Sequence, residues 1–152
     1  MIIRDNMKSQ VFSIHQDDIL AKAAKLFLKH NIGTLPVVDS EEKLVGVLTL
    51  QCLLRIVMPD FVDLVKSFRF LHNLGAVETR QPESADLHSL VKDKMQAPFF
   101  IEEDCSLLRA AATFQKEGVT DLPVVNKNGI LVGLVSHVDI GTALIKVWDL
   151  DL

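Results

Sequence analysis

The sequence contains little of what an exported or membrane-spanning protein needs. Its 152 residues include only two cysteines, Cys52 and Cys105, too few for a disulfide framework and without the paired spacing of a metal site. The longest apolar runs, such as residues 130–135, are far shorter than the roughly 20 residues that cross a bilayer. The N-terminus has an acid and an amide where a signal peptide has its apolar core. These absences predict a cytoplasmic protein with reduced cysteines and no membrane span.

An excess of basic charge is also absent. Lys and Arg total 16 against 20 Asp and Glu, for a formal charge of -4, and no dense basic run is interleaved with aromatic residues. Nucleic acid is therefore not an expected partner. Apolar residues make up 49% and charged residues 24% of the chain, which is typical of an ordinary globular protein.

Signatures of catalysis and metal binding are missing as well. The sequence has no nucleophile elbow, no Walker loop and no Gly-x-Gly-x-x-Gly segment. The histidines form no His-x-His, His-x-x-x-His or Cys/His cluster; they are His15, His30, His72, His88 and His137. We therefore expect neither an enzyme nor a metal site.

The chain does contain an internal repeat. Residues 35–38 (Leu-Pro-Val-Val) recur as residues 122–125, and residues 44–46 (Leu-Val-Gly) recur as residues 131–133, both at an offset of 87. Over residues 12–54 and their partners, 15 of 43 aligned positions are identical, whereas unrelated sequences of average composition share about 3. Because a repeat dictates architecture, two copies of one structural unit are expected.

Each copy predicts the order strand, helix, strand, strand, helix. The spacing from Leu20 to Phe27 is that of an amphipathic helix, and its copy recurs with the same spacing. We expect Asp17 and Asp18 to cap the first helix and Asp104 to cap the second. A proline-led apolar run, a polar turn and a β-branched run then predict two strands, followed by a further helix.

An extra stretch separates the copies. Phe61, Leu64, Val65 and Phe68 have helical spacing, and Asp86 is expected to cap a short helix that continues to Lys94. The helix that begins near Phe61 either packs on its own domain or forms a dimer or partner surface. The apolar residues of that helix, Phe61, Phe68 and Leu71, favour a homodimer.

The repeated Leu-Pro-Val-Val runs, the strands at 46–49 and 133–136, and Asp139 at the start of the last helix resemble the CBS-domain family, named after cystathionine β-synthase. The resemblance implies an α/β (α+β) fold in which two pseudo-symmetric β-α-β-β-α motifs pack into one module. The implied parts are motif 1 (1–57), a helical insertion or linker (58–86) and motif 2 (87–152).

The resemblance also implies a function. CBS pairs are regulatory modules that mostly bind AMP, ADP, ATP or S-adenosylmethionine in clefts between the motifs, and they commonly form dimers. By this resemblance the chain is a ligand-sensing module, AMP-like ligands being favoured, that requires no cofactor and acts on an effector protein that the sequence does not identify. The alternative is a ligand-free dimerisation scaffold.

In the family, a Ser/Thr-x-x-Asp corner binds the ribose hydroxyls and a phosphate, and it matches Ser136-His137-Val138-Asp139 here. The other motif supplies the adenine slot. The ligand-binding residues implied for this main site are Gln10, Val11, Phe12, Ile32, Gly33, Thr34, Pro36, Ser136, His137 and Asp139. The same Ser-x-x-Asp spacing also suits a helix capping box, so the corner has a purely structural interpretation too.

The first copy departs from this pattern. Thr49-Leu50-Gln51-Cys52 has a cysteine where the ribose carboxylate belongs, and a thiol is a weak acceptor. The residues implied for this weaker second site are Thr49, Phe99, Phe100, Val119, Thr120 and Asp121. We expect one competent site, or two of unequal strength.

Overall fold

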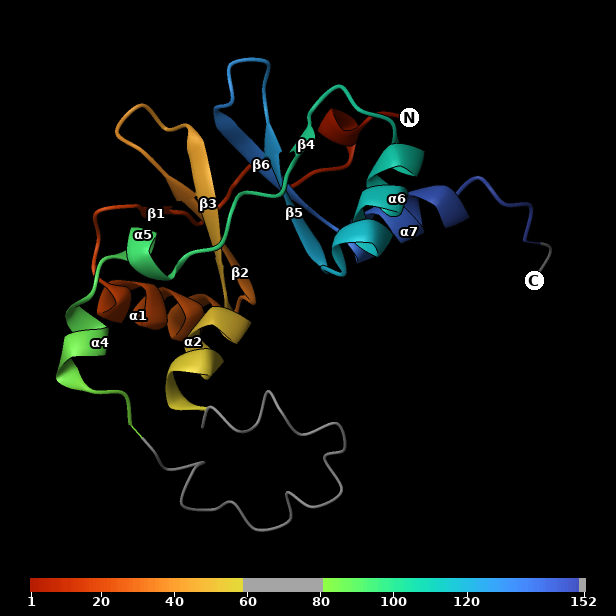
Figure 1. The fold of residues 1–152 in the computed structure, drawn as a ribbon. Coiled ribbons are helices and arrows are strands. Elements are labelled where there is room, and N and C mark those ends of the chain that lie inside the picture. Colours follow the sequence, from red (N-terminus) through yellow and green to blue (C-terminus); the bar gives the residue numbers. More distant parts are fainter. Residues whose placement is uncertain (59–80, 151–152) are drawn as a thin grey trace, which may run out of the picture.

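The computed structural model describes residues 1–58 and 81–150 and contains two three-stranded sheets (Figure 1). The first half contains β1 (Ile14–His15), α1 (Leu20–His30), β2 (Thr34–Val38), β3 (Leu44–Thr49) and α2 (Leu50–Val57). The second contains β4 (Ile101–Glu102), α6 (Leu107–Glu117), β5 (Asp121–Val125), β6 (Leu131–Ser136) and α7 (His137–Ile145). A 3-10 turn (Ile3–Asp5) precedes the first half, and α4 (Ser84–His88) and α5 (Val91–Lys94) precede the second. The predicted fold class and the order of elements within each copy are confirmed.

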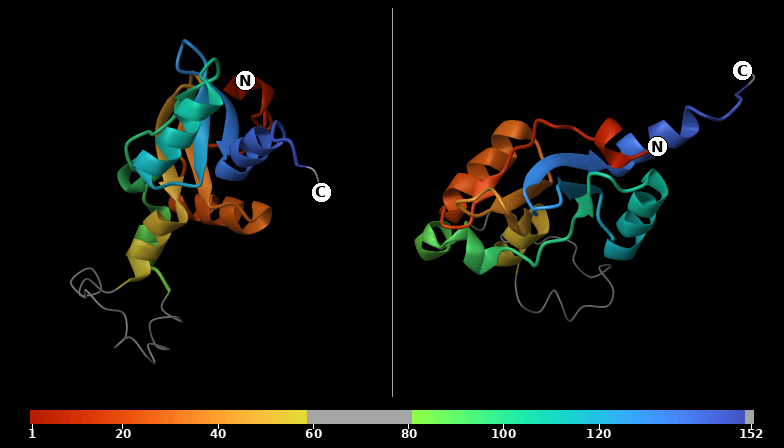
Figure 2. Two further views of the ribbon diagram at one scale, coloured as in Figure 1. Left: turned by 90° about the vertical axis from the view of Figure 1, so that its right-hand side faces the viewer. Right: turned by 90° about the horizontal axis from the view of Figure 1, so that it is seen from above.

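The two sheets have the same topology and the same register. β1 is parallel to β2, and β2 is antiparallel to β3, with Val37 opposite Gly46. In the second sheet Val124 lies opposite Gly133, at the same offset as in the sequence repeat. The turns of the two hairpins are joined, because the backbone N–H of Leu44 donates to the carbonyl of Gly129 (3.0 Å). The repeat therefore produces two equivalent sheets that meet along one side (Figure 2).

The short segment before each copy packs on the sheet of the other copy. Ile3 is fully buried in the core of the second half, and Val91 is fully buried in the core of the first half. Figure 1 shows the N-terminus beside β4 and α6, and α5 beside β1 and β3. Backbone pairs continue the exchange: Lys8 bonds Leu134 of β6 in both directions (2.8 and 2.9 Å), as Gln96 bonds Val47 of β3 (3.1 and 3.0 Å). Each sheet thus depends on a segment remote in sequence.

A short motif marks the exchanged segments. Ile3-x-Asp-x-Met7 and Val91-x-Asp-x-Met95 have the same spacing, offset by one residue from the main repeat. Met7 lies against Gly133 and Met95 against Gly46, where a Cβ atom on either glycine would overlap the methionine sulfur. A side chain at either position would displace the methionine, so the two glycines fit the close approach of the exchanged segments rather than an unusual backbone angle.

Ion pairs hold both exchanged segments. Lys92 Nζ donates to Asp17 Oδ1 (2.8 Å), and this hydrogen bond lowers the pKa of the Asp17 carboxyl and raises that of Lys92. At the other end of the molecule, Arg4 pairs with Glu103 (3.1 Å) and Asp104 (2.7 Å). These pairs are solvent-exposed, so they fix the position of the segments more than they stabilise the fold.

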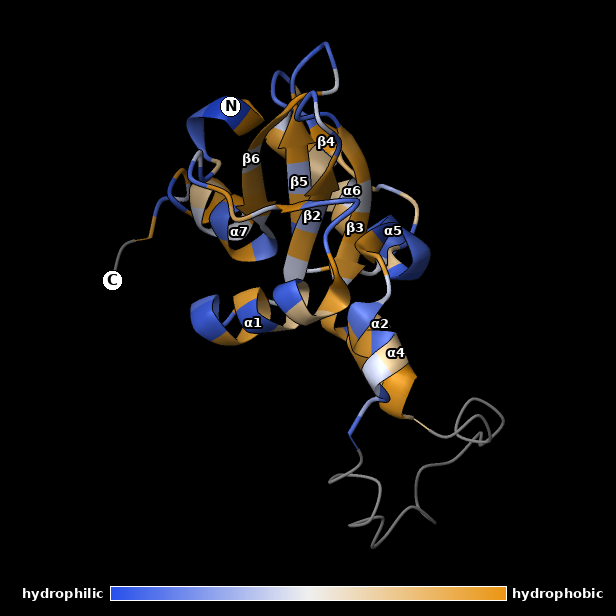
Figure 3. Cartoon of the chain, turned by 90° about the vertical axis from the view of Figure 1, so that its left-hand side faces the viewer, coloured by the Kyte–Doolittle hydropathy of each residue, from blue (hydrophilic) through white to orange (hydrophobic). Residues whose placement is uncertain are grey.

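Each half has its own apolar core, formed by one sheet, its helices and an exchanged segment, and the strands consist largely of hydrophobic residues (Figure 3). The predicted helix caps were wrong. α1 begins after Ile19 without a side-chain cap, because the Asp18 carboxylate instead accepts the backbone N–H of His15 (3.1 Å). α6 is capped by Ser106, not by Asp104.

The stretch between the copies also differs from prediction where the structure describes it. Asp86 lies inside α4 rather than capping a helix that reaches Lys94, because Ser89 and Leu90 are extended and separate α4 from α5. The expected helix and dimer face of residues 61–71 lie outside the described residues. Over residues 1–58 and 81–150, no helix is long and apolar enough to cross a membrane.

Candidate functional site

A cavity of about 260 Å³ lies where the N-terminal segment, the end of α1 and the starts of β2 and β5 meet. Its lining combines residues of both sequence copies. They are Lys8, Gln10, Val11, Phe12, Asn31, Ile32, Gly33, Thr34, Asp121 and Leu134. The structure therefore brings together six of the ten residues implied for the main site.

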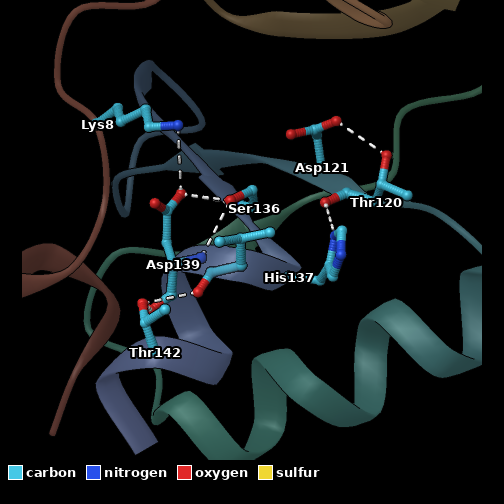
Figure 4. A network of polar contacts seen from close by, with 8 residues as sticks. Lys8, Thr120, Asp121, Ser136, His137, Asp139 and Thr142 are labelled. Carbon is cyan, nitrogen blue, oxygen red and sulfur yellow. Dashed lines mark hydrogen bonds and ion pairs between the residues drawn. The ribbon is translucent and has the colours of Figure 1, made fainter. Parts of the chain in front are cut away.

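The Ser136–Asp139 corner lies beside this cavity, at the junction of β6 and α7 (Figure 4). Asp139 Oδ2 accepts hydrogen bonds from the backbone N–H of Ser136 (2.9 Å) and from its hydroxyl (2.7 Å). Ser136 Oγ in turn accepts the backbone N–H of Asp139 (3.1 Å), which completes a capping box. Among the described residues, Asp139 Oδ1 accepts no hydrogen bond, so the cap uses only one carboxylate oxygen.

Lys8 connects the corner to the cavity. Its side chain lines the cavity, and its Nζ lies 3.7 Å from Asp139 Oδ2. The Lys8 side chain is 65% exposed and that of Asp139 is 22% exposed, so the ammonium group can turn toward a ligand at little cost. The exchange of segments is what brings Lys8 here, since it pairs with Leu134 on β6.

Phe12, the aromatic residue of the cavity lining, stacks on a histidine outside the lining. The Phe12 ring stacks on the His30 imidazole, with ring centroids 3.6 Å apart and planes 17° apart. Phe12 is 41% exposed, and the stack restricts the orientations of its ring. His30 at the end of α1 therefore positions a cavity residue without lining the cavity itself.

Two of the implied residues lie away from the cavity. The His137 side chain lies against Thr120, the residue just before β5 (Figure 4). Its Nδ1 is 3.3 Å from the carbonyl oxygen of Thr120, and the backbone N–H of His137 donates to the same oxygen (3.0 Å). Pro36 is buried inside β2, opposite Val47 of β3, and does not line the cavity.

The equivalent corner of the first copy is chemically different. Thr49 Oγ1 and Cys52 Sγ are 3.4 Å apart, and the Thr49 side chain makes no hydrogen bond that caps α2. A cavity of about 200 Å³ there includes Thr49, Val119 and Thr120 of the implied second site. The other members disperse: Phe99 packs against the second core, Phe100 is exposed, and Asp121 lines the main cavity. A larger space of about 470 Å³ on the outer side of Cys52 has Arg55 and Lys94 in its lining.

The sequence patterns assigned Lys8, Asn31 and Leu134 to no site and assigned Asp121 to the weaker second site, whereas all four line the main cavity. The Ile3-x-Asp-x-Met7 repeat was the available signal for Lys8, because it shows that the segment before the first copy is part of the repeated unit. Asn31 has a left-handed backbone (φ 49°) at the end of α1, a position that asparagine tolerates. Across residues 1–58 and 81–150, no three His, Cys, Asp or Glu side chains are grouped as metal ligands.

Known proteins match both the sequence and this geometry. A family model described as the CBS domain matches residues 3–59 and 91–146. A CBS domain-containing protein of Dictyostelium discoideum is 29% identical over 149 residues, covering 98% of this chain and 94% of that protein. The chain therefore belongs to the CBS domain family.

Two solved structures show the same fold. The crystal structure of CBSX2 in complex with AMP has a TM-score of 0.70 at 23% identity, covering 96% of this chain and 97% of that one. The CBS domain pair of protein MJ0100, in complex with 5′-methylthioadenosine and S-adenosyl-L-methionine, has a TM-score of 0.68 at 21% identity, covering 95% of each chain. The chain is thus a CBS domain pair.

Proposed function

We propose that this protein is a regulatory module that senses an adenosine-containing ligand, AMP-like in preference, in the cavity beside Asp139. The observation that carries the proposal is the location of that cavity. Residues of both copies line it, and it lies next to the Asp139 carboxylate, whose Oδ1 accepts no hydrogen bond from the described residues. Ligands in two structures of the same fold, AMP in one and methylthioadenosine with S-adenosylmethionine in the other, support this chemistry.

The lining provides a role for each part of such a ligand. Asp139 Oδ1 is available to accept a ribose hydroxyl, and an ionised acceptor makes the stronger hydrogen bond. Val11, Ile32 and the Phe12 ring offer apolar surface to the faces of adenine, while the backbone around Gly33 offers polar groups to its edge. Lys8 is the cation available to a single phosphate.

Binding in this cavity couples the two copies. The ligand contacts residues 31–34 of the first copy together with Asp121 and Asp139 beside the second sheet. A ligand shifts a conformational equilibrium only by the difference in its affinity for the two states. A ligand that needs both copies in place therefore favours one relative arrangement, which we propose an effector protein recognises.

The first test is a thermal shift panel with AMP, ADP, ATP, methylthioadenosine and S-adenosylmethionine. A ligand at ten times its dissociation constant stabilises the folded state by about 1.4 kcal/mol, which raises Tm by roughly 3 to 5 °C for a chain of this size. AMP is expected to shift Tm more than ATP at equal concentration, because Lys8 is the only cation among the described residues that line the cavity. No shift with any of the five ligands contradicts the proposed function.

The alternative function is a ligand-free scaffold, and the capping box favours it. Ser136 and Asp139 satisfy each other and the start of α7 with no ligand present, which is worth about 1 kcal/mol on its own. A silent panel, combined with stable self-association, supports the scaffold.

We further propose that the protein is a homodimer. Leu28 on α1 and Leu54 on α2 are 85% and 54% exposed, and between these helices and α4 lies an apolar groove of about 320 Å³. Such patches are typical of association surfaces. Sedimentation equilibrium at tens of micromolar is expected to give twice the 16.9 kDa chain mass, and Leu54→Glu is expected to weaken the dimer. A monomeric wild type at that concentration contradicts the dimer and leaves the ligand proposal intact.

A further inference from the structure

We propose that Asp121 determines ligand specificity in this cavity by limiting the negative charge that a bound adenosyl ligand can carry. The inference rests on the proposed function and deepens it. Its first support is position: Asp121 lines the cavity at the start of β5, and its Cα partner across the sheet is Ser136. Side chains of directly opposed residues lie on the same face, about 5 Å apart, so Asp121 neighbours the Ser136–Asp139 corner (Figure 4).

The charges around Asp121 leave it uncompensated. Lys8 and Asp121 are the charged residues that line the cavity, and Lys8 already faces Asp139 at 3.7 Å. Asp121 Oδ2 accepts the Thr120 hydroxyl (3.0 Å), a neutral donor, and no Lys, Arg or His within residues 1–58 and 81–150 forms an ion pair with it. One cation therefore stands against two carboxylates.

The first copy has none of this charge. At the positions equivalent to Asp121, Ser136 and Asp139 it has Thr34, Thr49 and Cys52. Thr34 is buried and lies opposite Thr49, as Asp121 lies opposite Ser136. The fold therefore accepts a neutral side chain at the first position of this strand. The negative charge at the start of β5 is thus not a requirement of the strand pairing.

The size of the cavity makes this charge effective. Asp121 and Lys8 line the same cavity, so a phosphate group that pairs with Lys8 lies in the same confined space as the Asp121 carboxylate. Charges this close and partly shielded from water interact appreciably, and each further phosphate adds repulsion. Asp121 therefore makes each phosphate beyond the one that pairs with Lys8 less favourable, so that AMP is accepted whereas ADP and ATP are disfavoured.

The test is the dependence of binding on ligand charge in Asp121→Asn and Asp121→Thr, the second of which copies Thr34. Calorimetry at low salt and without divalent ions uses methylthioadenosine, S-adenosylmethionine, AMP and ATP. For either variant, we expect the affinity for methylthioadenosine to change less than about twofold. AMP is expected to bind about threefold to fivefold tighter and ATP more than about tenfold tighter, whereas S-adenosylmethionine is expected to bind about twofold weaker. Glu41→Gln, which removes the same charge from an exposed turn, is the matched control and is expected to change none of the four.

The outcomes separate the two proposals. If the Asp121 substitutions change the affinity for all four ligands equally, or if the change in affinity does not depend on ligand charge, the proposed role of Asp121 is overturned, while the proposal that the module binds adenosyl ligands stands. If the wild-type protein binds none of the four, the proposed function fails, and the role of Asp121 fails with it. Melting curves of the variants without ligand establish that each is folded before titration.

Discussion

Asp139→Asn is expected to weaken adenosyl-ligand binding about 10- to 150-fold, which corresponds to about 1.5 to 3 kcal/mol. The free Oδ1 of Asp139 is the proposed ribose acceptor, and the neutral amide loses the charge that strengthens such a hydrogen bond. Methylthioadenosine is the most informative ligand for this measurement, because it has a ribose but no phosphate. Isothermal titration calorimetry gives the affinity directly.

The same substitution is expected to have little effect on folding. Asparagine retains an oxygen that can accept the backbone N–H of Ser136, so the cap persists. The lost ion pair with Lys8 is long and exposed, and the loss of charge near the start of α7 costs less than about 1 kcal/mol. The ligand-free melting curve of the variant measures this cost.

Cys52→Ser, at the equivalent corner of the first copy, is the control for that experiment. It changes a polar side chain at the same position of the motif without touching the proposed site, so affinity is expected to stay the same. Unchanged affinity in Asp139→Asn, for a wild type that binds, would place the ligand elsewhere and reduce the corner to a helix cap. A large loss of ligand-free stability in Asp139→Asn would instead contradict the prediction that asparagine maintains the cap.

Ile3→Ala is expected to lower the free energy of unfolding by about 3 kcal/mol, within the range of about 2 to 5 kcal/mol for buried Ile to Ala. Ile3 is 0% exposed and packs among Leu107, Leu122 and Val124 of the second core. Its backbone N–H also donates to the carbonyl of Cys105 (2.9 Å). Equilibrium urea unfolding measures the loss, and hydrogen exchange is expected to quicken most in β5 and β6 rather than in β2 and β3.

Leu108→Ala provides the comparison for Ile3→Ala. Leu108 lies on α6 in the second half and is 74% exposed, so its truncation is expected to change stability by less than about 0.5 kcal/mol. If Ile3→Ala costs under about 1 kcal/mol, or loosens the first half instead, the N-terminal segment does not stabilise the second core as described.

The repeated architecture could be predicted from the sequence alone. Two 11-residue helices, α1 and α6, and the paired strands beginning at Thr34 and Asp121 follow from local spacing of apolar residues and from turn residues. These features depend on residues within a few positions of one another in the sequence. The helices and strands were therefore predicted correctly even though the capping residues of the helices were not. The resemblance to CBS motifs was carried by the same local signals, and the family match confirmed it.

Which segments share a sheet and a cavity, in contrast, could not be predicted from the sequence and emerged from the folded chain. The pairing of Lys8 with Leu134, and of Gln96 with Val47, joins residues far apart in the chain. The motif shared by residues 3–7 and 91–95 marks both segments but does not show which sheet each one joins. The apolar character of Ile3 and Val91 predicts that both residues are buried. It does not predict in which half each is buried, because the two sheets offer similar apolar surfaces. Lys8 and Asp121 therefore became part of the candidate site through long-range pairing, and the charge of the cavity, which we propose governs ligand choice, followed from contacts that sequence order does not encode.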